Sequence, residues 1–482
     1  MVGGGYSAAA FAVQLVRRTR VPLDISIVEP RPHLGRGLAY STTDPDHRLN
    51  APLDSHGIDP DFPAQPRQWC GQNGVLERDP ECLAPGGQVF LRRGDFGIYV
   101  SDMVAQHAVD GRSGSRIHHV RDSAASAAAI DGHLQVVTQG HGVLDADLLV
   151  VATGNPVTAL RPPFRAEHTH DPRIIGNPLD PGCLDRIPQH ARVLVVGGGL
   201  TALDVLSTLI RRGHQAEILT ISRRGLRPRS HAPAILGPCP APGIPEPVNL
   251  VLDAPVPEFI AGVPATARSW LRALRGEIGR QQAAGHSWHG PFDAVRNVVW
   301  RIWPQLPARE KHRFLDKLRV YYDVHRFRMP PMNEALVKAA GQRGLIRTAA
   351  ARLTRVDTPA AASSIHVEWV EAGSGRAVRA DFDYVVNCTG LDHAAAARAN
   401  PFLRSMLEQG LLRPHATGLG FDVGPHCEAF DQSGRAQPSV RVVGPPTAGV
   451  FGDPLGAVFI AAQVRRILPD VMNTLETPSR AF

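Results

Sequence analysis

The pattern of apolar and polar positions is most regular between residues 191 and 213. A short apolar run, residues 193–196, is typical of a buried strand, and a later apolar repeat with helical spacing is typical of an amphipathic helix. Between them, Gly197, Gly199 and Ala202 stand at GxGxxA spacing. In this motif the first glycine permits a tight turn, the second lets the backbone approach a pyrophosphate, and the small third residue lets helix and strand pack closely. The stretch therefore predicts a dinucleotide-binding loop.

The first residues of the chain, MVGGGYSAAAFAVQL, repeat the second half of this pattern. Gly3, Gly5 and Ala8 have the same spacing and lead into a similar helix, but only Met1 and Val2 precede them. A glycine loop of this kind sits at the carboxyl end of a buried strand. We interpret the loop as real and its strand as clipped, with the true start several codons upstream. The chain as given is then expected to bind its nucleotide weakly.

The residues at the end of the strand after each loop predict which nucleotide binds. The segment LDISIVEP ends in Glu29, and a carboxylate at this position holds the ribose of an adenosine without an extra phosphate. The segment AEILTISRRG ends in Ser222, Arg223 and Arg224, and arginines suit the ribose phosphate of NADPH. The alternative for the arginine pair is a solvated turn. The economical assignment is FAD at the first loop and NADPH at the second.

A second repeat supports two nucleotide sites. Residues 133–155 read as a hairpin followed by a buried strand that ends in an Ala-Thr-Gly turn, and residues 365–390 repeat this plan with an Asn-Cys-Thr-Gly turn. We expect the first turn to lead the chain from the FAD domain into the NADPH domain and the second to lead it back. Cys388, in the second turn, is interpreted as a small packing residue and not as a nucleophile.

The predicted fold class is α/β, with two Rossmann-like dinucleotide-binding domains and the NADPH domain inserted into a discontinuous FAD domain. The expected bounds are 1–158 for the first part of the FAD domain, 159–345 for the NADPH domain with a proline-rich loop and a helical insertion, and 346–482 for the second part of the FAD domain. The proline-dense stretch 232–259 is a long ordered loop or a lid, since it can form neither a regular helix nor a central strand.

The carboxyl-terminal stretch reads as a last strand, a loop with Gly452 and Asp453, and a final helix. An Asp at this place can accept hydrogen bonds from the ribityl hydroxyls of a flavin, and the alternative is that it only caps the helix. In the middle of the chain, His325, Arg326 and Arg328 are candidates to hold an anionic substrate or the NADPH phosphate, the simpler alternative being a basic surface.

Composition narrows the classes of function. The net charge is +7, but Lys and Arg are dispersed without an aromatic-basic motif, which argues against nucleic acid as a partner. No apolar run approaches the length of a membrane span, so we expect a cytoplasmic protein. The 6 cysteines include no CxxC pair and no Cys/His cluster, which disfavours a metal site and a disulfide reductase. Oligomeric state is not predicted.

With these motifs the chain resembles the FAD/NAD(P)-binding oxidoreductases of the two-dinucleotide, glutathione-reductase-like type. More narrowly it resembles the bacterial group that includes HpyO-type FAD-dependent urate hydroxylases. The narrower motifs include GRGLAYSTTDPDHRLNAP (35–52), FLRRGDFGIYV (90–100) and YDVHRFRMPP (322–331). The resemblance implies FAD, reduction by NAD(P)H and often oxygen insertion. It makes Arg36, Tyr40 and Asn50 candidates for cofactor or substrate contact, with Arg93, Gly97 and Tyr99 in the second motif.

The predicted function is an FAD-dependent, NAD(P)H-consuming oxidoreductase, and specifically a monooxygenase of a small polar molecule. The alternatives are a flavin reductase or dehydrogenase without oxygen insertion, and a non-catalytic nucleotide-binding relative. No catalytic acid or base is predicted. The candidate cofactor-binding residues are Gly3, Gly5, Ser7, Ala8, Glu29, Arg36, Asn50, Thr153, Gly154, Gly197, Gly199, Leu200, Thr201, Ser222, Arg223, Arg224, Thr389, Gly390, Gly452 and Asp453.

Overall fold

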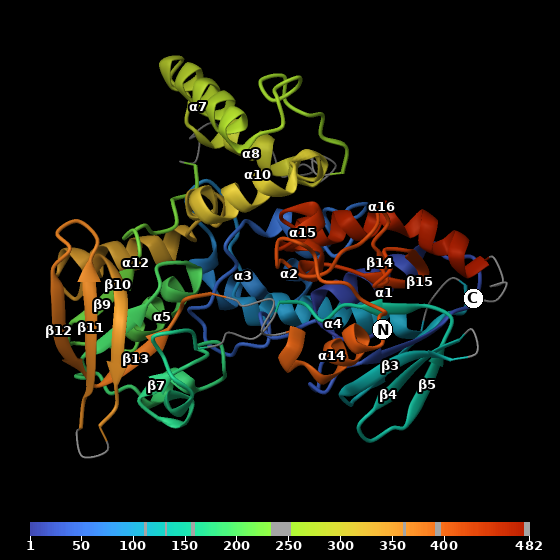
Figure 1. Ribbon diagram of the computed structural model, residues 1–482, viewed down its shortest axis with the longest axis horizontal. Coiled ribbons are helices and arrows are strands. Elements are labelled where there is room, and N and C mark those ends of the chain that lie inside the picture. The colour runs from blue at the N-terminus through green and yellow to red at the C-terminus, as the bar shows by residue number, and fades with distance from the viewer. Residues whose placement is uncertain are drawn as a thin grey trace.

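The computed structural model describes residues 1–109, 113–130, 133–155, 160–232, 252–359, 363–390 and 397–476. The chain forms two sheet-containing domains side by side, with a helical layer over them (Figure 1). Met1 and α16 (Ala457–Glu476), the last described helix, lie in the first domain. Within the described residues no helix is long and apolar enough to cross a membrane.

The first domain is built on a mostly parallel sheet. Its strands are, in spatial order, β2 (Arg116–Val120), β1 (Asp24–Val28), the single residue Val2, β6 (Leu149–Val151), β15 (Ala436–Val442) and β14 (Glu428–Phe430). Val2 takes the central place, because its N–H donates to the Val150 carbonyl at 2.9 Å and its own carbonyl accepts from Ala152 at 2.9 Å. On the other side the Gly3 N–H donates to the Val28 carbonyl at 3.0 Å. The segment Met1–Gly3 therefore supplies the strand that the first glycine loop needs.

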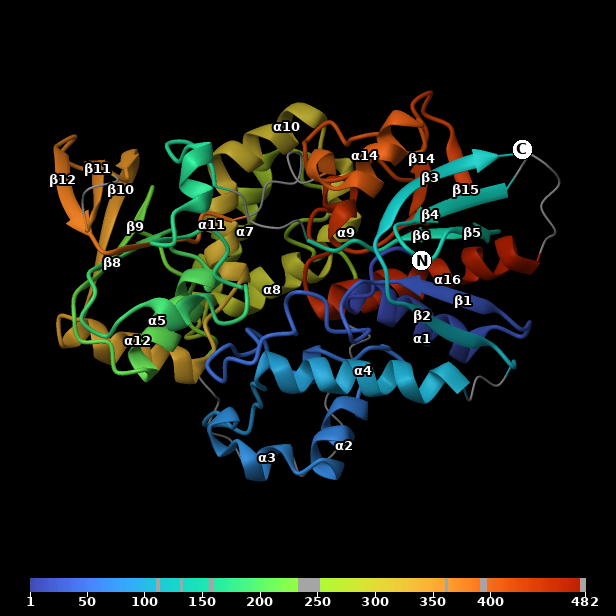
Figure 2. The same ribbon diagram turned by 90° about the horizontal axis from the view of Figure 1, so that it is seen from below.

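Successive side chains of these strands point to opposite faces of the sheet, so the first domain has one hydrophobic core on each face. Val150 faces a core shared with α1 (Tyr6–Arg18), α4 (Arg93–Val109) and α16 (Ala457–Glu476). Leu149 and Val151 face the opposite core, because successive side chains of a strand point to opposite faces. The second core is closed by the antiparallel sheet of β3 (Ala124–Ile130), β4 (His133–Thr138) and β5 (Val143–Ala146) together with α14 (Pro401–Glu408). Figure 2 shows α1, α4 and α16 near one another on one side of the molecule.

Shorter elements complete this domain. They are η1 (Leu53–Ser55), α2 (Gln65–Gln72), α3 (Val75–Arg78), η2 (Pro80–Cys82), η7 (Pro445–Thr447) and α15 (Ala448–Phe451). A buried ion pair of Arg48 with Asp79, at 2.8 Å, joins the segment before η1 to the end of α3.

The second domain contains a seven-stranded sheet in the order β12, β11, β10, β9, β8, β13, β7. The bounds are β7 (Ile174–Ile175), β8 (Val193–Val196), β9 (Ile218–Ser222), β10 (Ile346–Asp357), β11 (Ile365–Glu371), β12 (Ala377–Phe382) and β13 (Tyr384–Asn387). The helices α5 (Leu200–Arg211) and α12 (Pro331–Gln342) pack together on one face, and the short helices η3 (Ala166–His170) and η4 (Cys183–Arg186) precede β8 along the chain.

This sheet corrects the expected domain bounds. β10 pairs in parallel with β9, and β13 pairs in parallel with β8. Residues 346–387 therefore belong to the second sheet, and the boundary expected at 345/346 moves to the turn after Asn387. The physical reason is that β10 continues the parallel sheet before the chain turns into the hairpin of β11 and β12, so the repeated hairpin unit is itself part of the inserted domain.

The helical layer comes from residues 252–329. Its elements are α7 (Ala267–Ala283), α8 (His289–Asn297), α9 (Val299–Ile302), η5 (Trp303–Gln305), α10 (Ala308–Arg313), a π-helical turn η6 (Phe314–Leu318) and α11 (Arg319–Arg326). Of the proline-dense stretch expected to form a loop or lid, residues 233–251 lie outside the described part of the chain.

Candidate functional site

The first glycine of each loop packs on the backbone of the turn that ends the repeated hairpin unit. A Cβ on Gly3 would lie 2.5 Å from the Ala152 carbonyl oxygen, and one on Gly197 would lie 2.1 Å from the Cys388 carbonyl oxygen. Both glycines have positive φ, +92° and +126°. Only glycine fits these two positions, because any Cβ would meet fixed backbone. In each domain, the glycine loop thus packs against the turn that ends the repeated hairpin unit.

Little or no protein packs against the second glycine of each loop. No atom lies within 4 Å of a Cβ built on Gly199, and a Cβ on Gly5 would meet only Gly37, at 3.4 Å. Gly5 and Gly199 are also the N-cap residues of α1 and α5, and neither has a side chain to satisfy the first N–H groups of its helix. Such free N–H groups at a helix start attract a pyrophosphate. The geometry fits a dinucleotide at each loop.

Residues flanking the loops have the expected places. Ser7 and Ala8 are buried in the first turns of α1, where Ser7 packs on Gly444. Leu200 and Thr201 open α5 and are half-buried. The structure brings these residues to the loops, and their contact with a cofactor stays a prediction.

Glu29, directly after β1, is bound to the first glycine loop. Its Oε2 accepts a hydrogen bond from the Gly4 N–H at 2.9 Å, and its Oε1 accepts from the Arg31 N–H at 3.0 Å. The side chain is buried. A carboxylate held in this way beside the loop fits the hydroxyls of a ribose.

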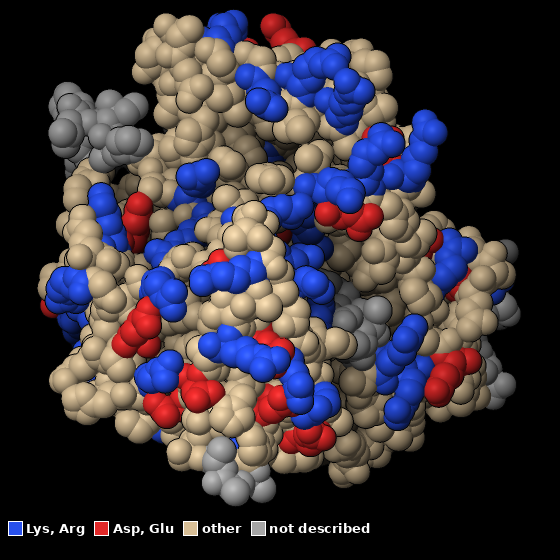
Figure 3. Space-filling view, turned by 60° about the vertical axis from the view of Figure 1, so that its left-hand side comes forward, with Lys and Arg blue, Asp and Glu red and all other residues tan. Residues whose placement is uncertain are grey.

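The end of β9 stands beside the second loop. A Cβ on Gly198 would lie 3.2 Å from the Ser222 hydroxyl, so the loop packs directly on the strand end. Arg223 and Arg224 are exposed, and within the described residues neither has an ion-pair partner; the Arg224 guanidinium lies 5.3 Å from the centre of the Tyr321 ring. Figure 3, which brings this domain forward, shows Lys and Arg side chains gathered along the middle of the face. The strand end is therefore suited to an anion.

The two hairpin turns leave their glycines open to solvent. Gly154 and Gly390 have φ of +70° and +93°, and a Cβ on either would meet no atom within 4 Å. The Thr389 hydroxyl donates to the Asn387 side chain at 2.8 Å, which orders the second turn. Thr153 takes the corresponding place in the first turn. Burial raises the pKa of Cys388 far above its usual range, in keeping with a packing residue.

The two long motifs of the first domain pack on each other. A Cβ on Gly97 would lie 2.2 Å from the Tyr40 carbonyl oxygen, and the Tyr40 ring meets the Phe96 ring edge to face with 4.8 Å between centroids. Arg36 donates to the Ser101 hydroxyl at 3.1 Å, and the Asn50 carbonyl is 3.0 Å from Nε2 of His231. The Arg36 and Asn50 contacts with a cofactor or substrate stay predictions.

Arg93 and Tyr99, from the second motif, have structural partners. Arg93 forms an ion pair with Asp204 of α5 at 2.7 Å and so joins the two domains. Tyr99 is fully buried, and its hydroxyl accepts from the Ile58 N–H at 3.4 Å. Burial raises the pKa of Tyr99 well above its usual range.

Asp453 is not a helix cap, because α16 begins only at Ala457. Its Oδ2 accepts from Arg326 Nε at 2.5 Å and from the Tyr322 hydroxyl at 3.0 Å. Its Oδ1 is buried and has no hydrogen-bond partner among the described residues. Burial and the neighbouring Asp453 raise the pKa of Tyr322, so this hydroxyl keeps its proton.

The two arginines among the basic residues His325, Arg326 and Arg328 are therefore not part of an exposed basic surface. Arg326 is buried against Asp453, and Arg328 is buried with its guanidinium 2.5 Å from Asp293. Carboxylates of the protein already neutralise these two arginines, which leaves Arg223 and Arg224 as the better candidates for the cofactor phosphate.

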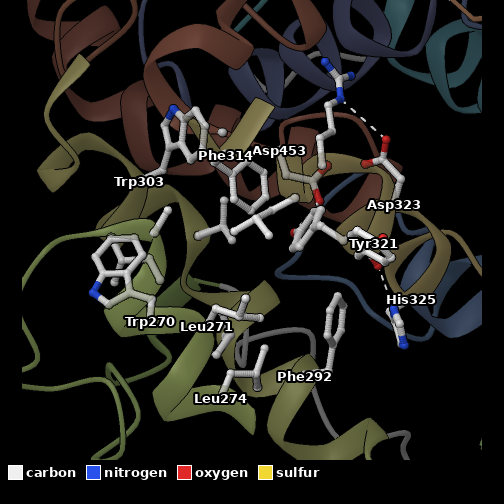
Figure 4. Close-up of a pocket in the computed structure, with 18 of the residues that line it drawn as sticks. Trp270, Leu271, Leu274, Phe292, Trp303, Phe314, Tyr321, Asp323, His325 and Asp453 are labelled. Atoms are coloured by element: carbon white, nitrogen blue, oxygen red, sulfur yellow. Dashed lines mark hydrogen bonds and ion pairs between the residues drawn. The ribbon is translucent and has the colours of Figure 1, made fainter. Parts of the chain in front are cut away.

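A cavity of about 500 Å³ lies between the helical layer and the loop with Gly452 and Asp453. Figure 4 shows aromatic and leucine side chains around this space, with Asp323 and Asp453 toward one end. Burial raises the pKa of Asp323 to about 6, although Arg319 lies 3.5 Å away. This cavity could not be predicted from the sequence, because its walls come from residues 260–327 and 419–455, far apart along the chain.

The chain is similar to known proteins in part of its sequence and in its whole fold. Residues 1–156 match a family model described as FAD-NAD(P)-binding. L-lysine 6-monooxygenase of Pseudomonas syringae superposes with a TM-score of 0.64 over 98% of this chain and 99% of that one, at 16% identity. Ornithine hydroxylase of Pseudomonas aeruginosa superposes with a TM-score of 0.62 over 98% of both chains, at 14% identity. The chain has the fold of the two-dinucleotide-binding flavoproteins.

This flavoprotein fold confirms the predicted fold class and its inserted second domain. Among sequence relatives, an uncharacterized protein of Mycobacterium tuberculosis (strain ATCC 25618 / H37Rv) is 26% identical over 399 residues, which are 76% of this chain and 68% of that protein. Within the described residues no group of three metal-ligating side chains is found, and the described cysteines Cys70, Cys82, Cys183, Cys388 and Cys427 are buried and free.

Proposed function

We propose that the protein is an FAD-dependent, NADPH-consuming monooxygenase of a small molecule. The observation that carries this proposal is the pair of glycine loops, whose second glycines have little or no protein packed against them, together with the opposite charges at the strand ends that follow them. The full-length likeness in fold to ornithine, lysine and cadaverine hydroxylases supports it. The expected substrate is a small molecule with a polar group, and an amine is the first to test.

FAD would lie along the first loop. Gly5 and the first N–H groups of α1 would meet its pyrophosphate, and Glu29 would hold the ribose. Gly452 and Asp453 lie beside the start of α16, where a flavin ring is expected to end in this fold. When bound, FAD would accept hydride from NADPH and activate oxygen. The protein contributes binding, orientation and exclusion of water.

NADPH would lie along the second loop. Gly199 leaves room for its pyrophosphate, and Arg223 and Arg224 would bind the ribose phosphate, because no carboxylate among the described residues neutralises them. Arg93 paired with Asp204 then fixes the orientation of α5 toward the first domain. The proposed roles of the two nucleotides follow from the different charges of the two strand ends.

Narrower expectations belong to the same proposal. The HpyO-type motifs make urate a second substrate to test beside amines. We also propose that the protein works in the cytoplasm, needs no metal ion and does not bind nucleic acid.

The absorption spectrum of the purified protein, loaded with FAD and then mixed anaerobically with NADPH, tests the proposal. We expect a yellow protein that bleaches with NADPH, recovers its colour in air, and consumes oxygen and NADPH together while a hydroxylated product forms. Bleaching without oxygen-dependent product would favour a reductase or dehydrogenase. NADPH binding by a protein that takes up no FAD would contradict the proposal and favour a non-catalytic relative.

Gly199→Ala supplies a control for this experiment. Its added methyl group enters the open space at the second loop and touches no protein atom. We expect the variant to keep its FAD colour and to bleach much more slowly at a given NADPH concentration. Equal bleaching rates would contradict the assignment of NADPH to this loop.

A further inference from the structure

The cavity under the helical layer is lined mainly by apolar side chains. α7 contributes Trp270, Leu271, Leu274 and Ile278, and the opposite wall comes from α8, α9, η5 and η6. A volume of about 500 Å³ is within the range of small-molecule sites, which run from roughly 300 to 1,000 Å³. Aromatic and aliphatic walls of this kind stabilise apolar ligand surface and offer little to a zwitterion.

Most polar side chains of this cavity come from α11 and from Asp453, and Arg275 of α7 lines it as well. Asp453, Tyr322 and Asp323 lie at one end, and Figure 4 shows the two carboxylates on the side away from Trp270. The buried Oδ1 of Asp453 and the Nη2 of Arg326 lack hydrogen-bond partners among the described residues. Buried polar atoms without partners are rare, and the unpartnered Oδ1 belongs to Asp453, which lines the cavity, so it indicates a missing ligand or water there.

The polar end adjoins the segment assigned to the flavin. The Trp303 Nε1 donates to the Gly449 carbonyl at 2.9 Å, and a Cβ on Gly452 would lie 2.7 Å from Val299 and 2.9 Å from Trp303. A Cβ on Gly456 would lie 3.1 Å from the Arg326 guanidinium. The helical layer thus closes directly on the loop before α16, and the cavity leads from that loop toward α7.

We propose that this cavity binds the substrate and that the substrate carries its polar reacting group on a larger apolar body, an aliphatic chain or an aromatic ring. The apolar body lies between α7 and the α8–η6 wall, and the polar group lies beside Asp453 and Tyr322. The proposal rests on the proposed function for the identity of the ligand as substrate. It distinguishes the expected substrate from the amino acids lysine and ornithine, for which enzymes of the same fold are named.

A series of unbranched primary amines from butylamine to octylamine tests the cavity. Binding is measured on the FAD-loaded protein without NADPH, by the change in tryptophan fluorescence, because Trp270 and Trp303 line the cavity. We expect the dissociation constant to fall by about fourfold for each added methylene group, the effect of burying one CH₂. Lysine and ornithine are expected to bind more weakly than octylamine.

Substitutions at two positions of α7 test whether the amines bind in this cavity. Leu274 lines the cavity, whereas Arg272 is exposed on the same helix outside its lining. Leu274→Gln is expected to weaken octylamine binding by tenfold or more and butylamine binding much less, while Arg272→Gln leaves the series unchanged. Leu274→Trp, which narrows the cavity without adding charge, should exclude octylamine and retain butylamine.

A dissociation constant that does not change with chain length would overturn the cavity proposal, as would equal effects of Leu274→Gln and Arg272→Gln. The NADPH oxidation rate, measured in parallel, separates this outcome from failure of the proposed function. Binding that depends on chain length, with no amine-dependent oxygen use or product, supports the cavity as a ligand site and contradicts the monooxygenase. Product formation without dependence on chain length supports the monooxygenase and overturns the apolar site.

Discussion

At the scale of single residues, the same glycine spacing serves two opposite needs. Gly197 is pressed against the Cys388 carbonyl, so its missing side chain makes room for the protein itself. Gly199 faces open space, so its missing side chain makes room for a ligand. The motif requires glycine at both positions, and the reason differs between them.

This difference predicts opposite phenotypes for two equal substitutions. Gly197→Ala places a methyl group against fixed backbone at a φ of +126°, and we expect the free energy of unfolding to fall by on the order of 3 kcal/mol. Gly199→Ala, at φ −86°, should leave the unfolding transition unchanged and raise the Kd for NADPH at least tenfold. Thermal unfolding and NADPH titration measure the two effects. A stable Gly197→Ala protein would contradict the assigned packing.

Arg223 carries a second prediction at this scale. Arg223 directly follows β9 and is exposed. An ion pair of its guanidinium with the ribose phosphate would favour NADPH over NADH. Arg223→Ser is expected to lower kcat/KM for NADPH about tenfold, the effect of losing roughly 1.4 kcal/mol, and to leave that for NADH unchanged. Arg379→Ser, which removes an exposed arginine from β12 of the same domain, is the control. Equal losses with both nucleotides would contradict the prediction.

At the scale of elements, helix α12 holds the two domains together through one buried side chain. The Asn333 Nδ2 donates to the Asp46 carbonyl of the first domain at 3.0 Å and to the Ser207 hydroxyl of α5 at 2.8 Å. Beside it, the Thr208 hydroxyl donates to Asp44 at 2.8 Å. These contacts fix α5, and with it the second glycine loop, relative to the first domain.

Asn333→Leu is expected to lower the free energy of unfolding by about 1–3 kcal/mol, because it leaves the partly buried Asp46 carbonyl and the buried Ser207 hydroxyl without this partner. Urea unfolding followed by circular dichroism measures this change. Lys338→Ala, on the exposed side of the same helix, should have little effect. If both variants unfolded alike, the contact would not contribute to holding the domains.

At the scale of the whole molecule, buried histidines make stability depend on pH. His56 is buried, and burial lowers its pKa from 6.5 to about 4. As the pH falls below 6.5, the unfolded chain takes up a proton at this residue that the folded protein does not accept until about pH 4. The stability from neutral His56 is therefore complete above pH 6.5 and is lost toward pH 4.

Because burial lowers the pKa of His56, the free energy of unfolding should depend on pH differently in the wild type and in His56→Gln. The wild-type free energy of unfolding should fall between pH 6.5 and 4 by on the order of 3 kcal/mol more than that of His56→Gln, which has no group that titrates there. Chemical unfolding at half-unit steps of pH measures it. His133→Gln, at an exposed position, should follow the wild-type curve. Parallel curves for wild type and His56→Gln would contradict the buried neutral histidine.

The fold could be predicted from the sequence because its signals are local. Each glycine loop occupies one continuous segment with its strand and its helix, residues 2–18 and 193–211, and strand direction, loop position and helix start follow from their order. Glu29 and Arg223 could be placed for the same reason, since each directly follows a strand. The domain bound at 345/346 was wrong because an added parallel strand, β10, carries no signal of which sheet it joins.

The sequence by itself determined the two nucleotide loops, their opposite strand-end charges and the repeated hairpin units. Only the tertiary structure decided that Arg326 is neutralised by Asp453, that Asn333 joins the domains, and that the helical layer encloses an apolar cavity. The physical reason is how far apart along the chain the interacting residues lie. A loop's backbone conformation depends on neighbours along the chain, whereas an ion pair across 127 residues and a cavity between distant segments exist only once the chain has folded.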